Sequence, residues 1–151
     1  MTIITCIEDL QTLYQRRVPR MFYDYTESGS WSEATFRDNT DAFEKIKFRQ
    51  RVLVNMENRN LSTSMLGQSV SMPVALAPVG LTGMQRADGE IKAARAAEEF
   101  GVPYTLSTMS ICSIEDVARS TQQPFWFQLY VMRDRDYIKR LINRAKAADC
   151  S

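Results

Sequence analysis

Histidine is absent from this sequence of 151 residues. The imidazole side chain is the commonest general acid or base near neutral pH. A reaction that needs an imidazole therefore cannot be completed by these residues alone.

Long hydrophobic runs and an excess of one charge are absent as well. No apolar stretch approaches the roughly 18 residues that a membrane-spanning helix requires. The first residues lack the basic and apolar regions of a secretion signal. Lysine and arginine total 19 against 18 acidic residues, a net charge of +1. We therefore expect a cytoplasmic or peripheral protein with no electrostatic attraction to nucleic acid.

Cysteine is scarce and widely spaced. Cys6, Cys112 and Cys150 form no C-x-x-C pair and are odd in number. This spacing argues against a disulfide framework or a structural zinc site. We expect three reduced cysteines in or near the core, and no metal.

The composition that remains, 44% hydrophobic and 25% charged, is typical of a globular domain. Residues 5–14 predict a helix in which Thr5 and Glu8 form a capping box, and Pro19 ends or restarts it. Residues 32–48 predict a second helix. Its expected apolar stripe is Phe36, Phe43 and Ile46.

The middle of the sequence predicts a short β-hairpin and then a buried strand. Residues 61–65 and 69–72 read as two strands around a turn that contains Gly67. Residues 73–79 are apolar throughout and end at a glycine, which is typical of a strand buried on both faces.

From residue 73 onward, strands and helices alternate three times. The expected strands are 73–79, 104–107 and 124–130, and the expected helices are 88–100, 114–119 and 133–148. Asp88 and Ser113 are expected to cap the first two helices, and Gly101 to end the first. This alternation predicts parallel strands covered by helices.

Two architectures fit such a pattern, an open doubly wound sheet and a (β/α)8 barrel. The first strand–helix connection, residues 78–84, contains two glycines but no G-x-G-x-x-G fingerprint. This favours the barrel. We therefore expect an α/β chain whose residues 1–72 form a helical and hairpin lead-in. Residues 73–151 would form the first three βα units of a TIM barrel, ending where a fourth strand would begin.

Active sites of barrels lie at the carboxyl ends of the strands. The residues at these ends are Pro78, Val79 and Gly80, then Ser107, then Gln128 and Tyr130. Taken alone, Ser107 could be a helix cap, Gln128 a satisfied core amide and Tyr130 a packed tyrosine. Their convergence at one face makes them site candidates.

Several short segments carry a further signal. They are 19–25, 28–29, 72–78, 89–90, 106–108, 113–117 and 126–130. Together, in order and spacing, they resemble the family of flavin mononucleotide (FMN)-dependent 2-hydroxy-acid oxidases and dehydrogenases, (β/α)8 barrels with N-terminal helices. Residues 106–108 and 126–131 look most like the bacterial L-lactate dehydrogenases. Plant glycolate oxidases usually carry tryptophan where this sequence has Met109.

The resemblance implies roles for the candidate residues. Pro78, Val79 and Gly80 resemble the segment whose backbone approaches the flavin near its reactive nitrogen, and many relatives have alanine at the Gly80 position. Ser107 and Gln128 resemble hydrogen-bonding partners of the flavin's pyrimidine edge. Two tyrosines, Tyr25 and Tyr130, resemble the substrate-contacting pair.

The activity that the resemblance implies is oxidation of an L-2-hydroxy acid, L-lactate above all, with electrons passing to a quinone or cytochrome. The histidine base, the substrate-binding arginine and the lysine near the flavin are absent, so this chain alone is expected to be inactive and to bind FMN poorly. The family also implies a tetramer and association with the inner face of the bacterial inner membrane. Alternatives are a truncated non-catalytic half-barrel, a glycolate oxidase or mandelate dehydrogenase, and, with less support, another FMN barrel such as a type 2 isopentenyl diphosphate isomerase.

Overall fold

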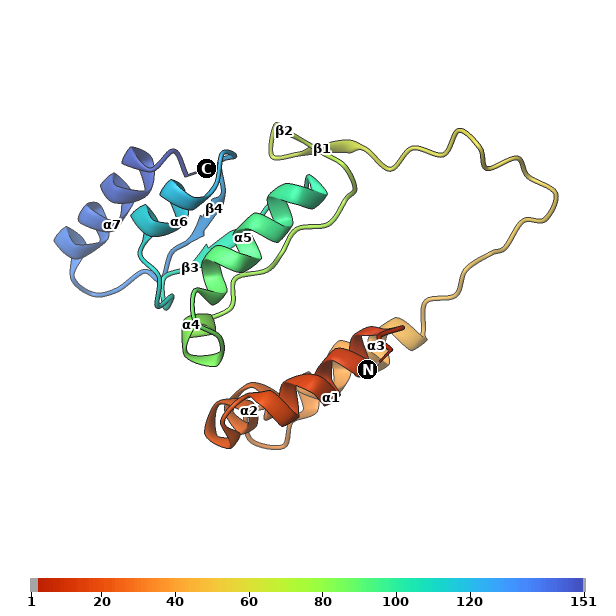
Figure 1. The fold of residues 1–151 in the computed structure, drawn as a ribbon, viewed down its shortest axis with the longest axis horizontal. Coiled ribbons are helices and arrows are strands. Elements are labelled where there is room, and N and C mark those ends of the chain that lie inside the picture. The colour runs from red at the N-terminus through yellow and green to blue at the C-terminus, as the bar shows by residue number, and fades with distance from the viewer. Residues whose placement is uncertain (1–2, 151) are drawn as a thin grey trace. The chain divides into compact units, whose positions relative to one another are not determined.

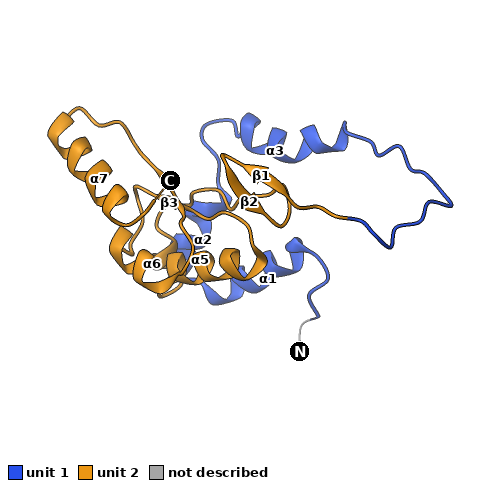
Figure 2. Ribbon diagram, turned by 90° about the horizontal axis from the view of Figure 1, so that it is seen from above, with its two compact units in different colours: residues 1–59 blue, residues 60–151 orange. Residues whose placement is uncertain are grey.

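The computed structural model describes residues 3–150 and divides the chain into two compact units, Met1–Arg59 and Asn60–Ser151. Figure 2 shows the two units in different colours. The β-hairpin belongs to the second unit, together with the strands and helices that follow it.

The first unit consists of three helices: α1 (Ile7–Arg17), α2 (Arg20–Glu27) and α3 (Ala34–Glu44). Pro19 separates α1 from α2, as predicted. The predicted capping box is wrong by one position. The carboxylate of Asp9, not Glu8, accepts the N–H groups of Thr5 and Cys6 at 2.8 and 3.3 Å, because the first turn begins at Ile7.

Apolar side chains of the first unit are largely exposed. None of its three helices contains a buried residue among those described. The second predicted helix is shorter than expected, and its apolar stripe faces solvent, since no other element of the unit covers it: Phe36, Phe43 and Ile46 are all exposed. Cys6 is also exposed, which corrects the expectation that all three cysteines lie in or near the core.

The hairpin of the second unit has the predicted place and turn. Strands β1 (Thr63–Met65) and β2 (Gln68–Val70) pair antiparallel. Leu66 and Gly67, with φ of 51° and 80°, connect them. Two residues of positive φ match the right-handed twist of the flanking strands. The Ser71 hydroxyl and N–H then bond to the carbonyls at the end of the next long helix, at Phe100 and Gly101.

The three predicted strands lie side by side in parallel, in sequence order. β3 (Thr105–Ser107) pairs with β4 (Trp126–Gln128), and Leu76 forms a parallel bridge to Tyr104. Residues 73–79 form only this bridge and not a full strand. They are largely exposed, so the expected burial on both faces is wrong. The physical reason is that this segment has a strand neighbour on one side alone among the described residues.

Four helices accompany these strands in Figure 1: α4 (Thr82–Gln85), α5 (Gly89–Phe100), α6 (Ile114–Ser120) and α7 (Arg135–Ala147). The last three match the predicted helices to within two residues at every end, and Gly101 ends α5 in the left-handed conformation. Asp88 lies at the N-cap of α5 with φ of 56°, but its side chain makes no capping bond, contrary to expectation.

The core lies between the strands and helices α5, α6 and α7. Its members, all buried, are Ala94, Ala97, Tyr104, Leu106, Ile114, Val117, Phe125 and Ala145. Small alanines on α5 let this helix approach the strands closely, which is consistent with dense interior packing. The strands are therefore anchored on the side that the helices cover.

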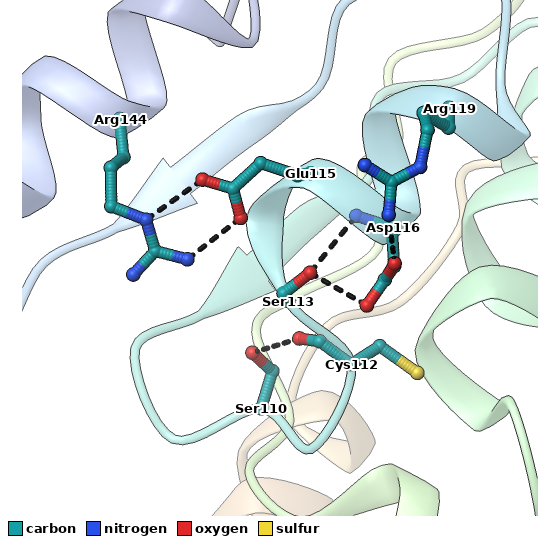
Figure 3. A network of polar contacts seen from close by, with 7 residues as sticks. All are labelled: Ser110, Cys112, Ser113, Glu115, Asp116, Arg119 and Arg144. Carbon is teal, nitrogen blue, oxygen red and sulfur yellow. Dashed lines mark hydrogen bonds and ion pairs between the residues drawn. The ribbon is translucent and has the colours of Figure 1, made fainter.

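A polar network outside the core fixes α6 (Figure 3). The Ser113 hydroxyl accepts the N–H of Asp116 at 3.0 Å, the predicted cap. Arg144 of α7 donates two parallel hydrogen bonds, both 2.7 Å, to the carboxylate of Glu115 on α6. This bidentate ion pair joins the two helices on their outer side.

Candidate functional site

Ser107 and Gln128, the last residues of β3 and β4, are paired in the parallel register. The Ser107 hydroxyl donates to Gln128 Oε1 at 3.2 Å. Ser107 is 3% exposed, whereas Gln128 is only partly buried. The two predicted polar residues therefore meet at the carboxyl ends of the strands.

Thr108 connects this pair to Tyr130, and the sequence analysis missed it. Its hydroxyl donates to the carbonyl of Gln128 and accepts the N–H of Tyr130 at 3.1 Å. A hydroxyl residue directly after a strand that ends in serine is the signal that could have identified it. Thr108 fixes the path of the chain after β4, so Tyr130 stays at the same end of the sheet.

The loop after the first strand position reaches the same end. The N–H of Leu81 donates to the carbonyl of Met109 at 2.9 Å. A Cβ placed on Gly80 would lie 3.4 Å from the Cβ of Met109, an ordinary contact. Gly80 and Met109 are therefore neighbours, and the segment that contains Pro78 and Val79 joins Ser107 and Gln128 at one face.

Several donors at this face are unused. The N–H groups of Val79 and Gly80 make no hydrogen bond within the part of the chain that the structure describes. The side-chain amide nitrogen of Gln128 likewise makes no hydrogen bond among the described residues, because the hydrogen bonds of this side chain are accepted by Oε1. Val79 and Tyr130 are about half exposed to solvent, at 50% and 52%. This end of the sheet presents free donors on an open surface.

One carboxylate lies directly behind this face. Glu90, in the first turn of α5, is 0% exposed. Its Oε1 accepts the N–H groups of Gly83 at 3.0 Å and Ile111 at 2.9 Å. The sequence analysis noted Glu90 only as part of a family-like segment and gave it no role.

Tyr25 lies in α2 of the first unit and is 64% exposed. The predicted partner tyrosine, Tyr130, belongs to the second unit. The structure thus brings together Gly80, Ser107, Gln128 and Tyr130, and the role of Tyr25 stays a prediction.

A cavity of about 220 Å³ lies elsewhere in the second unit. It is lined by residues that precede β3 and β4, including Tyr104 and Phe125, and by the hairpin residues Gln68 and Val70. It therefore lies at the amino ends of the strands, away from Ser107 and Gln128.

The chain is an α/β structure, with parallel strands in sequence order and helices packed against them. Polar groups at the carboxyl ends of the strands make that end the candidate site. Residues 14–151 match the family model described as FMN-dependent dehydrogenase, so the chain belongs to that family. The family is FMN-dependent, and its members are flavoprotein oxidoreductases acting on 2-hydroxy acids.

Solved structures agree with this assignment. The chain is 39% identical to a soluble mutant of the membrane-associated (S)-mandelate dehydrogenase from Pseudomonas putida, with a TM-score of 0.88, covering 94% of this chain and 40% of that one. A monotopic membrane (S)-mandelate dehydrogenase is 37% identical, with a TM-score of 0.92 and coverage of 98% and 39%. A putative lactate oxidase from Pediococcus acidilactici is 28% identical, with a TM-score of 0.91 and coverage of 99% and 42%.

The chain therefore spans about 40% of the length of the solved structures that it matches. No helix that the structure describes is long and apolar enough to cross a bilayer.

The unused donors fit the cofactor of this family. A flavin carries carbonyl oxygens on its pyrimidine edge, which need donors such as the side-chain NH2 of Gln128. The Ser107 hydroxyl donates its proton to Gln128 Oε1, so it orients this amide and can act toward the ring only as an acceptor. The free N–H groups of Val79 and Gly80 suit a ring whose reduced form is negatively charged.

Proposed function

We propose that this chain is the N-terminal portion of an FMN-dependent dehydrogenase that oxidises an L-2-hydroxy acid. The observation that carries the proposal is the meeting of Ser107, Gln128 and the free N–H groups of Val79 and Gly80 at the carboxyl ends of parallel strands. FMN, when bound, accepts the electrons that leave the substrate.

In this proposal the chain's own residues bind and orient. Ser107 and Gln128 hold the pyrimidine edge, and the hydrogen bond between them limits the rotation of the Gln128 amide. The backbone of Pro78, Val79 and Gly80 would approach the ring, with the N–H groups of Val79 and Gly80 as its donors, since proline has none. The Tyr130 hydroxyl would bind the substrate near its carboxylate, because a phenol donates without adding charge. Tyr25 is proposed as the second tyrosine of the substrate-contacting pair.

We further propose that the second unit belongs to a (β/α)8 barrel, with residues 73–151 as its first three βα units and residues 1–72 as lead-in within one domain. The parallel order of three consecutive strand positions supports a barrel over a reordered open sheet. The exposed apolar face of residues 74–79 is consistent with further strands covering it.

L-lactate is the first substrate proposed, with a quinone or cytochrome as electron acceptor. (S)-mandelate, a larger acid of the same handedness, is the second candidate. Its support is the 37–39% identity to (S)-mandelate dehydrogenases, against 28% to the lactate oxidase. The missing side chain at Gly80, where many relatives carry alanine, leaves room beside the flavin position for a larger group.

The expected whole protein is a homotetramer in the cytoplasm, associated peripherally with the inner face of the bacterial inner membrane. The support for membrane association is the monotopic (S)-mandelate dehydrogenase among the similar structures.

The test is an absorbance spectrum of the protein made from the complete reading frame that contains this chain. We expect flavin bands, and anaerobic loss of the longest-wavelength band on addition of the L-acid but not the D-acid. L-lactate, (S)-mandelate and glycolate added in parallel decide the substrate. A purified protein without flavin bands, or one bleached by none of the three acids, would contradict the proposal.

A further inference from the structure

The buried carboxylate of Glu90 is held mainly by backbone N–H donors, and the Cys112 thiol interacts with it as well. None of the ion pairs among the described residues includes Glu90, and its Oε2 has no hydrogen-bond partner there. Burial acts to raise the pKa of Glu90, but the N–H groups of Ile111 and Gly83 outweigh it, so this pKa lies below its ordinary value. Glu90 is thus ionised at neutral pH inside the protein.

Packing does not explain a charge at this position. A buried charge without a counter-ion is destabilised by the loss of its hydration, and an apolar side chain of the same volume is often at least as stabilising. The charge also disturbs its neighbours. Burial raises the pKa of Cys112, and the Glu90 carboxylate raises it further. The pKa of Tyr104 is likewise raised by burial and then by Glu90.

The two N–H groups that Glu90 accepts belong to different segments next to the strand-end face, Gly83 to the short helix α4 and Ile111 to the loop after β3. Gly83 follows the segment 78–80, and Ile111 follows Ser107 and Met109. Glu90 Oε1 therefore links the two segments by one hydrogen bond to each. A second hydrogen bond, from the N–H of Leu81 to the carbonyl of Met109, connects the same two segments.

The packing at Gly83 shows how close this approach is. A Cβ on Gly83 would lie 2.7 Å from the Cβ of Ile111 and 2.9 Å from Glu90 Oε2. Contacts below 3.0 Å require a shift, so the loops can close on Glu90 only because residue 83 has no side chain.

We propose that Glu90 is a positioning residue for the flavin site, whose carboxylate sets the spacing between the loop of Val79 and Gly80 and the loop of Ser107 and Met109. This inference rests on the proposed function, because the two loops carry the proposed flavin contacts. Glu90 acts through Gly83 and Ile111 and does not itself touch the flavin.

Two substitutions of similar volume separate this role from packing. Glu90→Gln keeps an oxygen acceptor at the same reach, and Glu90→Met keeps the volume but removes the acceptor. Glu98→Gln is the matched control. Glu98 lies on the same helix and accepts the N–H of Gln122 at 2.7 Å, away from the strand-end face.

The readouts are the dissociation constant of FMN and amide hydrogen exchange at Gly83 and Ile111, both measured on the complete protein. Glu90→Met is expected to weaken FMN binding about tenfold or more and to speed exchange at both amides. Glu90→Gln should stay within about threefold of the wild type in FMN affinity. Glu98→Gln should leave FMN affinity unchanged.

The outcomes are distinguishable. Normal FMN affinity in Glu90→Met overturns this inference alone, as does equal weakening in Glu90→Gln and Glu90→Met. A wild-type protein that binds no FMN overturns the proposed function instead. Should Glu90→Met fail to fold, Glu90→Asp takes its place, because it keeps the charge but shortens the reach by one methylene. It must show the same faster exchange and weaker binding, and normal behaviour there overturns the inference.

Discussion

Two glycines after the first strand position differ in how closely other atoms approach them. An added Cβ at Gly83 would meet Ile111 at 2.7 Å, whereas one at Gly80 would meet Met109 at 3.4 Å. Neither residue is among those with positive φ, so the difference is one of space and not of backbone conformation.

We predict that Gly83→Ala lowers the free energy of unfolding by about 1–3 kcal/mol, the usual cost of an overpacked site. Gly80→Ala, the matched control, should stay within about 0.5 kcal/mol of the wild type. Urea unfolding followed by circular dichroism measures both. Equal stability of the two variants would contradict the close packing at Gly83.

The residues that sequence analysis could identify are those whose role is local. Ser113 precedes its helix by one position, and Gly101 follows its helix, so both could be predicted from neighbours in the chain. Glu90 takes one partner from 21 residues away, and Thr108 takes its partners from 20 and 22 residues away. No periodicity encodes such contacts, which is why their roles emerged only from the structure.

Between elements, the ion pair of Glu115 and Arg144 is the best-defined contact outside the core. The hydrogen bonds from Arg144 are the largest cause that lowers the pKa of Glu115 from 4.5 to about 2. Both side chains are about half exposed, at 41% and 47%, so solvent screens their attraction.

This contact predicts a pH-dependent part of the stability. Because the folded pKa lies below the unfolded one, the stabilisation is present above pH 4.5 and is lost as the pH falls toward about 2. At pH 7, Glu115→Gln should cost about 0.5–1 kcal/mol, after allowance for screening.

Urea unfolding at several pH values between 7 and 3 tests this prediction. The difference between the wild type and Glu115→Gln should shrink as the medium is acidified. Glu99→Gln, which removes an exposed carboxylate of α5 that makes no ion pair among the described residues, is the control. A difference that stays constant with pH would show that the ion pair does not stabilise the protein.

Element order was predictable, and element length was not. Signals within their own sequences define the helices: Gly101 ends α5, Ser113 caps α6 and Asp134 caps α7. Strand pairing depends instead on neighbours that are distant in sequence. The apolar run 73–79 therefore predicted a full buried strand, whereas it forms a single bridge at Leu76 and is largely exposed.

At the scale of the whole molecule, the two units differ in how they are stabilised. The buried core belongs to the second unit, while the three helices of the first contain no buried residue among those described. Composition and periodicity predicted amphipathic helices in both. They could not predict which apolar stripes would find a partner within the chain, because burial is a property of the whole assembly of elements.

The openness of the strand-end face leads to the last prediction, that this chain alone binds FMN more weakly than about 1 µM. A well-bound ligand of this size has roughly 70–90% of its surface covered, yet Val79 and Tyr130 are about half exposed. The donors at Gly80 and Gln128 can orient a flavin but cannot cover its second face. Quenching of FMN fluorescence on titration with the chain measures the affinity, and the protein from the complete reading frame is the comparison. Micromolar or tighter binding by the chain itself would mean that these residues enclose the flavin without further strands.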